Sequence, residues 1–211
     1  MDNTSDRSLS TGATRVHPFS HLIRRQPWAE AVQAARGKDG TEVVRTQNPA
    51  MFIHVDQSYI GAEMILRDNM APEETAKLRE TRWGIINVWR PIERKVTREP
   101  LAVCDARSVR ESDLRPVMGF LPAKGQNGLG NVSHGETVEL WNVAYSPCHK
   151  WYYASEMTPD EVLMIKCFDS KLDGRARRSP HSAFQSDNDH GPARQSIEVR
   201  CLVFWEDQEV E

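Results

Sequence analysis

The sequence predicts a mainly β fold with flanking helices, in which two sheets pack as a sandwich or barrel. Eight short runs are rich in β-branched and aromatic residues and are bounded by Pro, Gly, Asp or Asn. Helical patterns are confined to the first 83 residues, and short strands at this spacing favour a double sheet. A chain of 211 residues is long enough for one domain with a substantial core.

The N-terminal part is expected to hold a tail and the helices. Residues 1–14 are rich in Ser, Thr and Asp, which predicts a disordered tail ahead of a single domain over 15–211. The segment WAEAVQAARGK, 28–38, is expected to form a helix that ends at its glycine. A second helix is expected over 72–83, PEETAKLRETRW, because a proline and two acidic residues open it.

The expected strands begin after the first helix and continue to the C-terminus. Their alternation and turn residues place them at 41–47, 51–55, 83–92, 100–105, 137–145, 161–170, 181–184 and 196–205. Two stretches rich in Gly, Ser and Asp, 122–135 and 171–193, are long enough to be functional loops.

Composition excludes several classes of protein. With 30 acidic and 27 basic residues the net charge is −3, which gives no reason to expect a nucleic-acid partner. No apolar run approaches the ~20 residues of a membrane span, and the N-terminus lacks the apolar core of a signal peptide. The four cysteines lie far apart without C-x-x-C spacing, which indicates reduced thiols in a cytoplasmic protein.

The stretch MFIHVDQSYIG, 51–61, carries the candidate metal site. His54 and Asp56 follow an apolar run two positions apart, so in a strand their side chains share a face. His181 opens another expected strand. Two imidazoles and one carboxylate are the facial ligand set of mononuclear non-haem Fe(II), so these residues are predicted as catalytic metal ligands. Two alternatives remain open on this pattern alone. The same ligands could bind zinc or an inert metal, or His54 could be a structural histidine beside a capping aspartate.

A facial iron site leaves room for a keto-acid co-substrate, whose far carboxylate needs a partner. Arg194 and Ser196 lie at the start of the last expected strand and share a face, and Arg200 lies further along that face. Arginine suits the role because its planar guanidinium makes two parallel hydrogen bonds to a carboxylate. The alternative, surface arginines on an edge strand, stays open for either residue taken singly.

Five blocks carry a resemblance to a known family. They are HVDQS, IINVWRPI followed by PLAVCDARSV, WYY-x₃-MTPDEVLMIKCFDS, DGRAR-x₂-PHSAF, and RQSIEVRCLVFW. In these blocks, over roughly residues 50–205, the chain resembles the fungal non-haem iron oxygenases labelled gibberellin-desaturase-like or cephem-methoxylase-like. The resemblance implies a double-stranded β-helix (jelly-roll, cupin-like) core. It also implies Fe(II)/2-oxoglutarate-dependent hydroxylation, desaturation or related oxidation of a small natural product by O₂ in secondary metabolism.

The resemblance also implies roles for individual residues. His54, Asp56 and His181 fall on the family's iron-ligand positions. Arg194 and Ser196 fall on its co-substrate positions, with Arg200 following in the same block.

Four further residues are candidates for the pocket. Asn87 is a polar residue in an apolar strand and is expected to be buried at the co-substrate site. Arg90, Trp151 and Tyr153 are expected to contact the substrate. The alternatives are an ion pair between Arg90 and an acid such as Asp105, and core packing for the two aromatic residues.

Only 53 residues precede His54, fewer than members of this family usually carry. We therefore expect thin N-terminal sheet coverage, exposed strand edges and a homodimer. The second functional hypothesis is a shortened relative that acts as a non-redox isomerase or cyclase, or as a non-catalytic partner subunit.

Overall fold

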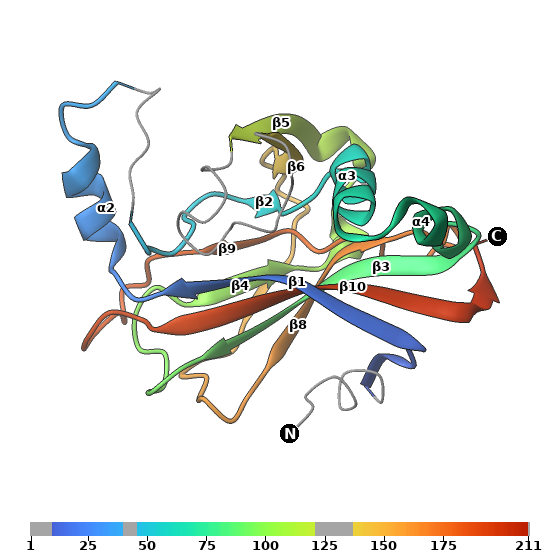
Figure 1. Cartoon of the computed structure of the whole chain (residues 1–211). Coiled ribbons are helices and arrows are strands. Elements are labelled where there is room, and N and C mark those ends of the chain that lie inside the picture. Colours follow the sequence, from blue (N-terminus) through green and yellow to red (C-terminus); the bar gives the residue numbers. More distant parts are fainter. Residues whose placement is uncertain (1–9, 40–45, 121–136, 211) are drawn as a thin grey trace.

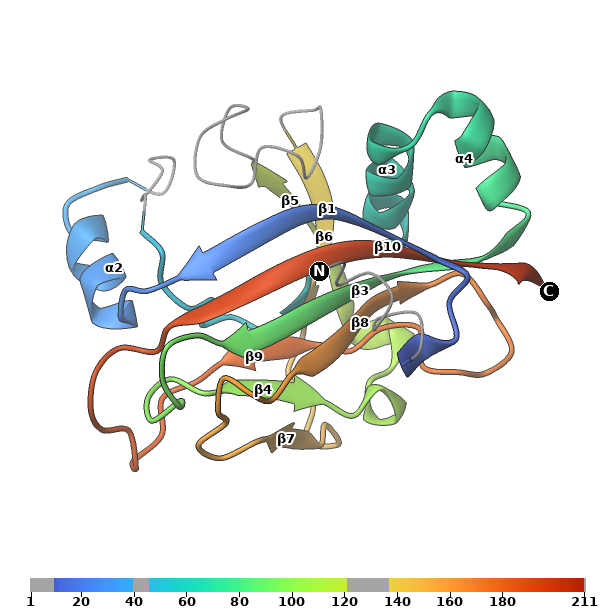
Figure 2. The same cartoon turned by 60° about the horizontal axis from the view of Figure 1, so that its bottom comes forward.

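The computed structural model describes residues 10–39, 46–120 and 137–210, and these form two facing antiparallel sheets (Figures 1 and 2). One sheet has the strand order β1-β10-β3-β8 and the other the order β5-β6-β2-β9-β4-β7. The mainly β prediction with flanking helices is confirmed.

The strand bounds are β1 Arg15–Arg24, β2 His54–Val55, β3 Thr81–Pro91, β4 Leu101–Cys104, β5 Leu114–Phe120, β6 Thr137–Val143, β7 Trp151–Tyr153, β8 Leu163–Asp169, β9 His181–Ala183 and β10 Ser196–Glu209. The helices are α2 Trp28–Ala35, α3 Tyr59–Asn69 and α4 Pro72–Leu78, with short 3₁₀ turns at Ala106–Ser108 and Glu111–Asp113. No helix in these described ranges is long and apolar enough to cross a membrane.

The main core lies between the two sheets. One buried cluster joins side chains from both sheets. The four-stranded sheet contributes Ile85, Leu202 and Phe204, and the six-stranded sheet contributes Val55 and Val138. On the other face of β10, Cys201, Val203 and Trp205 form a second buried cluster. Because both faces of β10 are covered here, residues 201–205 form a continuous apolar run rather than an alternating pattern.

Helix α3 holds the chain in place directly after the candidate metal ligands. It begins at Ser58, whose hydroxyl accepts a hydrogen bond from the amide of Gly61 at 2.9 Å. A Cβ at Gly61 would lie 1.9 Å from the carbonyl oxygen of Glu139, so only glycine lets α3 approach β6 this closely. The helix therefore anchors the backbone two residues beyond Asp56.

Most of the expected strands are present with shifted ends. Those expected from residue 83 onward correspond to β3, β4, β6, β8, β9 and β10, and the helix expected at 28–38 is α2. The strand expected at 51–55 is reduced to His54–Val55. The helix expected over 72–83 stops at Leu78, because the chain enters β3 at Thr81.

Other expectations differ from the structure or fall outside it. The strand expected at 41–47 lies largely outside the described residues, and so does the loop 122–135. Of the expected tail, residues 1–9 are outside the described part, whereas Ala13 is buried and the backbone carbonyl of Thr11 accepts a hydrogen bond from Trp205. Thr11 and Ala13 therefore contact the rest of the folded chain.

Strands β1, β5 and β7 and helix α3 were not predicted from the sequence. Strand β1 reads as irregular because it contains Pro18, which lies at a register shift against β10. Proline is tolerated there because β1 is an edge strand of its sheet.

Candidate metal centre

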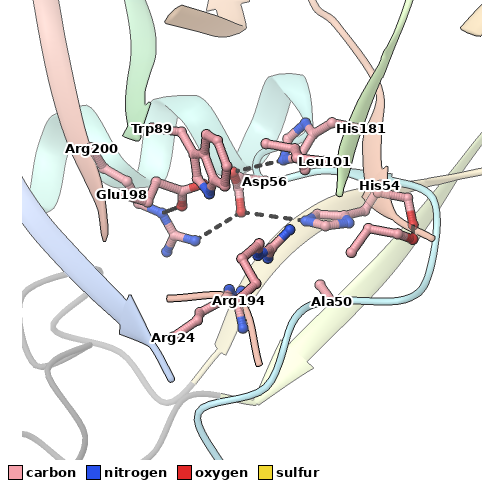
Figure 3. Close-up of a pocket in the computed structure, with 12 residues that line it drawn as sticks. Arg24, Ala50, His54, Asp56, Trp89, Leu101, His181, Arg194, Glu198 and Arg200 are labelled. Carbon is pink, nitrogen blue, oxygen red and sulfur yellow. Dashed lines mark hydrogen bonds and ion pairs between the residues drawn. The ribbon is translucent and has the colours of Figure 1, made fainter. Parts of the chain in front are cut away.

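The structure brings the three predicted ligands together. His54 and His181 are directly opposite each other where β2 pairs with β9, and their ring centroids lie 4.6 Å apart. Asp56 follows β2. The Nε2 atoms of His54 and His181 lie 3.8 Å and 3.5 Å from its two carboxylate oxygens (Figure 3). One ligand atom from each residue lies within 4.8 Å of the others, which suits a single metal ion.

Both imidazoles are oriented by backbone carbonyls. The Nδ1 atom of His54 lies 2.9 Å from the carbonyl oxygen of Phe52, and that of His181 lies 3.1 Å from the carbonyl oxygen of Ser179. In a neutral ring, the nitrogen that faces a carbonyl oxygen carries the proton, and Nε2 then offers its lone pair to a metal. Asp56 raises the pKa of His181 in spite of its burial, so a metal ion would compete with a proton at that nitrogen. Burial and the neighbouring His181 lower the pKa of His54 to about 4, which keeps this ring neutral.

The carboxylate of Asp56 is held at both oxygens. Asn87 donates to Oδ2 at 2.5 Å, and Arg200 donates to Oδ1 at 3.0 Å. Burial alone would raise the pKa of Asp56, but Arg200 and the two histidines outweigh burial and hold it well below its ordinary value. Asp56 is therefore an ionised carboxylate in a fixed orientation, which suits it to bind a metal ion.

These contacts change the expected roles of two residues. Asn87 is fully buried, as predicted, but its amide binds Asp56 and does not line the pocket. Arg200 lines the pocket and also binds the carboxylate of Glu198 at 3.0 Å, so two acids compensate its charge. Both residues thus position Asp56.

Arg194 differs from Arg200 because it has no acid partner among the described residues. Its side chain is buried in the pocket, donates one hydrogen bond to the backbone carbonyl of Glu99 at 2.7 Å, and lies against the ring of Trp89. Burial, followed by the nearby Arg24, lowers the pKa of Arg194 to about 9. A buried cation with an unpaired Nε is suited to bind an incoming carboxylate.

Ser196, the other predicted co-substrate residue, is buried at the first position of β10 but is not among the residues that line the pocket. Arg194 lies two residues before Ser196, ahead of the strand, and both side chains are buried.

The structure does not bring the three predicted substrate residues to this pocket. Arg90 is exposed, and its Nε atom donates to the adjacent carbonyl of Pro91, while Asp105 is bound by Arg107. Arg90 lies on the outer face because Asn87 and Trp89 occupy the inner positions of β3.

Trp151 and Tyr153 lie on β7, the strand at the edge of the six-stranded sheet. Trp151 packs against a small core cluster, and the half-exposed Tyr153 packs edge-on against Phe184 at 5.1 Å between ring centroids. Core packing, the alternative for Trp151, is what the structure shows.

The pocket includes residues that the sequence analysis missed. Trp89 and Glu198 share strand faces with Asn87 and Arg200, so alternation within β3 and β10 could have identified them. Arg24 also lines the pocket, but it comes from β1, which was not predicted.

Comparisons with known proteins show which family the chain resembles. Residues 7–204 match a family model described as an oxidoreductase/YMDC permease-like domain. The chain is 53% identical to the hydroxylase/desaturase efuI of Hormonema carpetanum, covering 96% of this chain and 68% of that protein. It is 48% identical to the hydroxylase/desaturase CTB9 of Cercospora beticola, covering 95% of this chain and 61% of that protein.

A solved structure shares the fold. The iron and alpha-ketoglutarate-dependent endoperoxidase NvfI superposes with a TM-score of 0.74 at 28% identity, over 95% of this chain and 66% of that one. This confirms the double-stranded β-helix fold. The chain thus spans about two thirds of the length of these relatives. On this evidence the chain belongs to the fungal hydroxylase/desaturase family, which includes Fe(II)/2-oxoglutarate-dependent dioxygenases.

Proposed function

We propose that the protein is an Fe(II)/2-oxoglutarate-dependent oxygenase that hydroxylates, desaturates or otherwise oxidises a small natural product, with His54, Asp56 and His181 as iron ligands. The observation that carries the proposal is the buried cross-strand pair of histidines whose Nε2 atoms face an ionised carboxylate. When bound, iron and 2-oxoglutarate supply the chemistry that activates O₂ and oxidises a C–H bond.

The surrounding residues have distinct roles in this proposal. Arg194 binds the distal carboxylate of 2-oxoglutarate, with Ser196 beside it. Of the two predicted arginines, Arg200 is paired with two acids, whereas the described contacts of Arg194 include no acid. Arg200 and Asn87 hold Asp56 in its ligating orientation. An oriented ligand set and a free carboxylate receptor support oxygenase chemistry over a non-redox isomerase or a non-catalytic subunit.

The protein's partners are then a small-molecule substrate and O₂, and we place the enzyme in the cytoplasm, without nucleic-acid or membrane partners. The acidic net charge supports the absence of a nucleic-acid partner, and the widely spaced cysteines support the cytoplasmic location. We further propose a homodimer, because β1 and β8 end the four-stranded sheet and offer edges for pairing. Sedimentation at micromolar concentration tests the dimer, and a 24.0 kDa monomer contradicts it.

An anaerobic titration tests the function. Iron-loaded protein titrated with 2-oxoglutarate should develop the weak visible charge-transfer band of a keto-acid chelated to Fe(II). The His181→Ala variant should lack the band, because two remaining ligands do not hold the metal in a facial site. A wild-type protein that binds iron without developing the band contradicts the oxygenase proposal.

A further inference from the structure

Arg24 is placed at the co-substrate end of the pocket by the register of the sheet. It is the last residue of β1 and pairs directly with Ser196 of β10. Side chains directly opposite each other in an antiparallel pair point to the same face, with Cβ atoms roughly 5 Å apart. Arg24 therefore lies beside the Arg194–Ser196 segment, and Figure 3 shows its side chain next to that of Arg194.

Neither of these arginines contacts a carboxylate within the described part of the chain. Arg24 donates to the backbone carbonyl of Asn48, and Arg194 donates to the backbone carbonyl of Glu99. The nearby acids are engaged elsewhere. Glu198 is bound by Arg200, and the carboxylate of Glu99 accepts a hydrogen bond from the amide of Trp28 at 3.0 Å.

The two guanidinium groups therefore repel each other in a buried pocket. Burial lowers the pKa of both arginines, and the charge of Arg24 lowers the pKa of Arg194 further. Arg200 adds to the positive potential at Arg24, while Glu198 and Asp56 oppose it. A bound anion between Arg24 and Arg194 would relieve this repulsion and complete the hydrogen bonding of both groups.

We propose that Arg24 and Arg194 act together as a two-arginine clamp on a single group, the distal carboxylate of 2-oxoglutarate. This inference rests on the proposed function and adds a second receptor residue, supplied by the edge strand β1. One carboxylate offers about four lone-pair positions and can accept both guanidinium groups. The direct pairing of Arg24 with Ser196 favours this shared carboxylate over a separate anionic group on the substrate.

Calorimetric titration of Mn(II)-loaded protein tests the clamp without relying on turnover. The two titrants are 2-oxoglutarate and 2-oxopentanoate, which has the same chain length but a methyl group in place of the distal carboxylate. The variants are Arg24→Gln and Arg194→Gln. The matched control is Arg25→Gln, because Arg25 is adjacent in sequence and its side chain is half exposed.

Arg24→Gln should weaken 2-oxoglutarate binding about 10- to 100-fold, as expected for losing a charge-assisted contact. Its affinity for 2-oxopentanoate should be unchanged, and Arg25→Gln should match the wild type with both acids. The Mn(II) affinity and melting temperature of each variant show whether the site is intact. If Arg24→Gln does not fold, Arg24→Lys takes its place and should lose part of the preference for 2-oxoglutarate.

The outcomes separate the clamp from the proposed function. A wild-type protein that does not prefer 2-oxoglutarate over 2-oxopentanoate overturns both. If the wild type shows the preference and only Arg194→Gln reduces it, the clamp is wrong and Arg24 serves a different anion. An equal loss for both acids in Arg24→Gln also overturns the clamp, since it assigns Arg24 a structural role.

Discussion

Replacing Arg200 by methionine should destabilise the protein strongly in the absence of metal. Arg200 is the cation that binds both Asp56 and Glu198, and the side chains of these two acids are 9% and 11% exposed. Removing it leaves Glu198 without its cation and leaves Asp56 with only the Asn87 amide and the two histidines, at a cost of about 3–5 kcal/mol for breaking a buried pair. At roughly 2–4 °C per kcal/mol for a domain of this size, the melting temperature should fall by about 6–20 °C.

A divalent metal should reverse part of this loss, because it places positive charge beside Asp56. The assay is thermal unfolding of wild type and Arg200→Met with and without Mn(II). The gain on adding metal should be larger in the variant. Arg90→Met is the matched control, since Arg90 is exposed on the neighbouring strand and should leave both values unchanged. A variant that melts like the wild type but loses 2-oxoglutarate binding would refute this reasoning and make Arg200 the co-substrate residue.

Three further changes test separate parts of the account. Arg194→Ala should weaken 2-oxoglutarate binding by about 30- to 1,000-fold in calorimetry while iron content stays intact, and Arg194→Lys should restore only part of it; unchanged affinity contradicts the assignment. Asn87→Leu should lower metal affinity about 10- to 100-fold in a chelator competition, because Asp56 loses an orienting donor; wild-type affinity contradicts this role. Gly61→Ala should destabilise the protein by about 1–3 kcal/mol or more and so lower its melting temperature, because the new Cβ would overlap the carbonyl of Glu139. An unchanged melting temperature contradicts the close approach.

Two of the three candidate ligands could be predicted from sequence because their geometry is local. His54 and Asp56 are two residues apart at a strand end, and that spacing alone places both side chains on one face. The third ligand, His181, was identified by residue type and by family resemblance. Its position opposite His54 depends on the pairing of β2 with β9, which no local pattern encodes.

The division of roles among the arginines could not be predicted, because it depends on which acids lie nearby in the fold. Arg194 and Arg200 are expected on the same strand face and look equivalent in sequence, although β10 begins only at Ser196. Only the approach of Asp56 and Glu198 distinguishes them. Arg24 was missed for a different reason. Its strand contains Pro18 at a register shift, so the alternation that indicates a strand is interrupted.

The most direct test of the central claim is the iron content of protein reconstituted anaerobically with Fe(II) and freed of excess metal. Wild type should hold one iron per chain. His54→Ala, Asp56→Ala and His181→Ala should each hold little or none, because a facial site needs all three ligands. His190→Ala should match the wild type, since this exposed histidine lies outside the site. Full iron content in any of the three ligand variants would contradict the site described above.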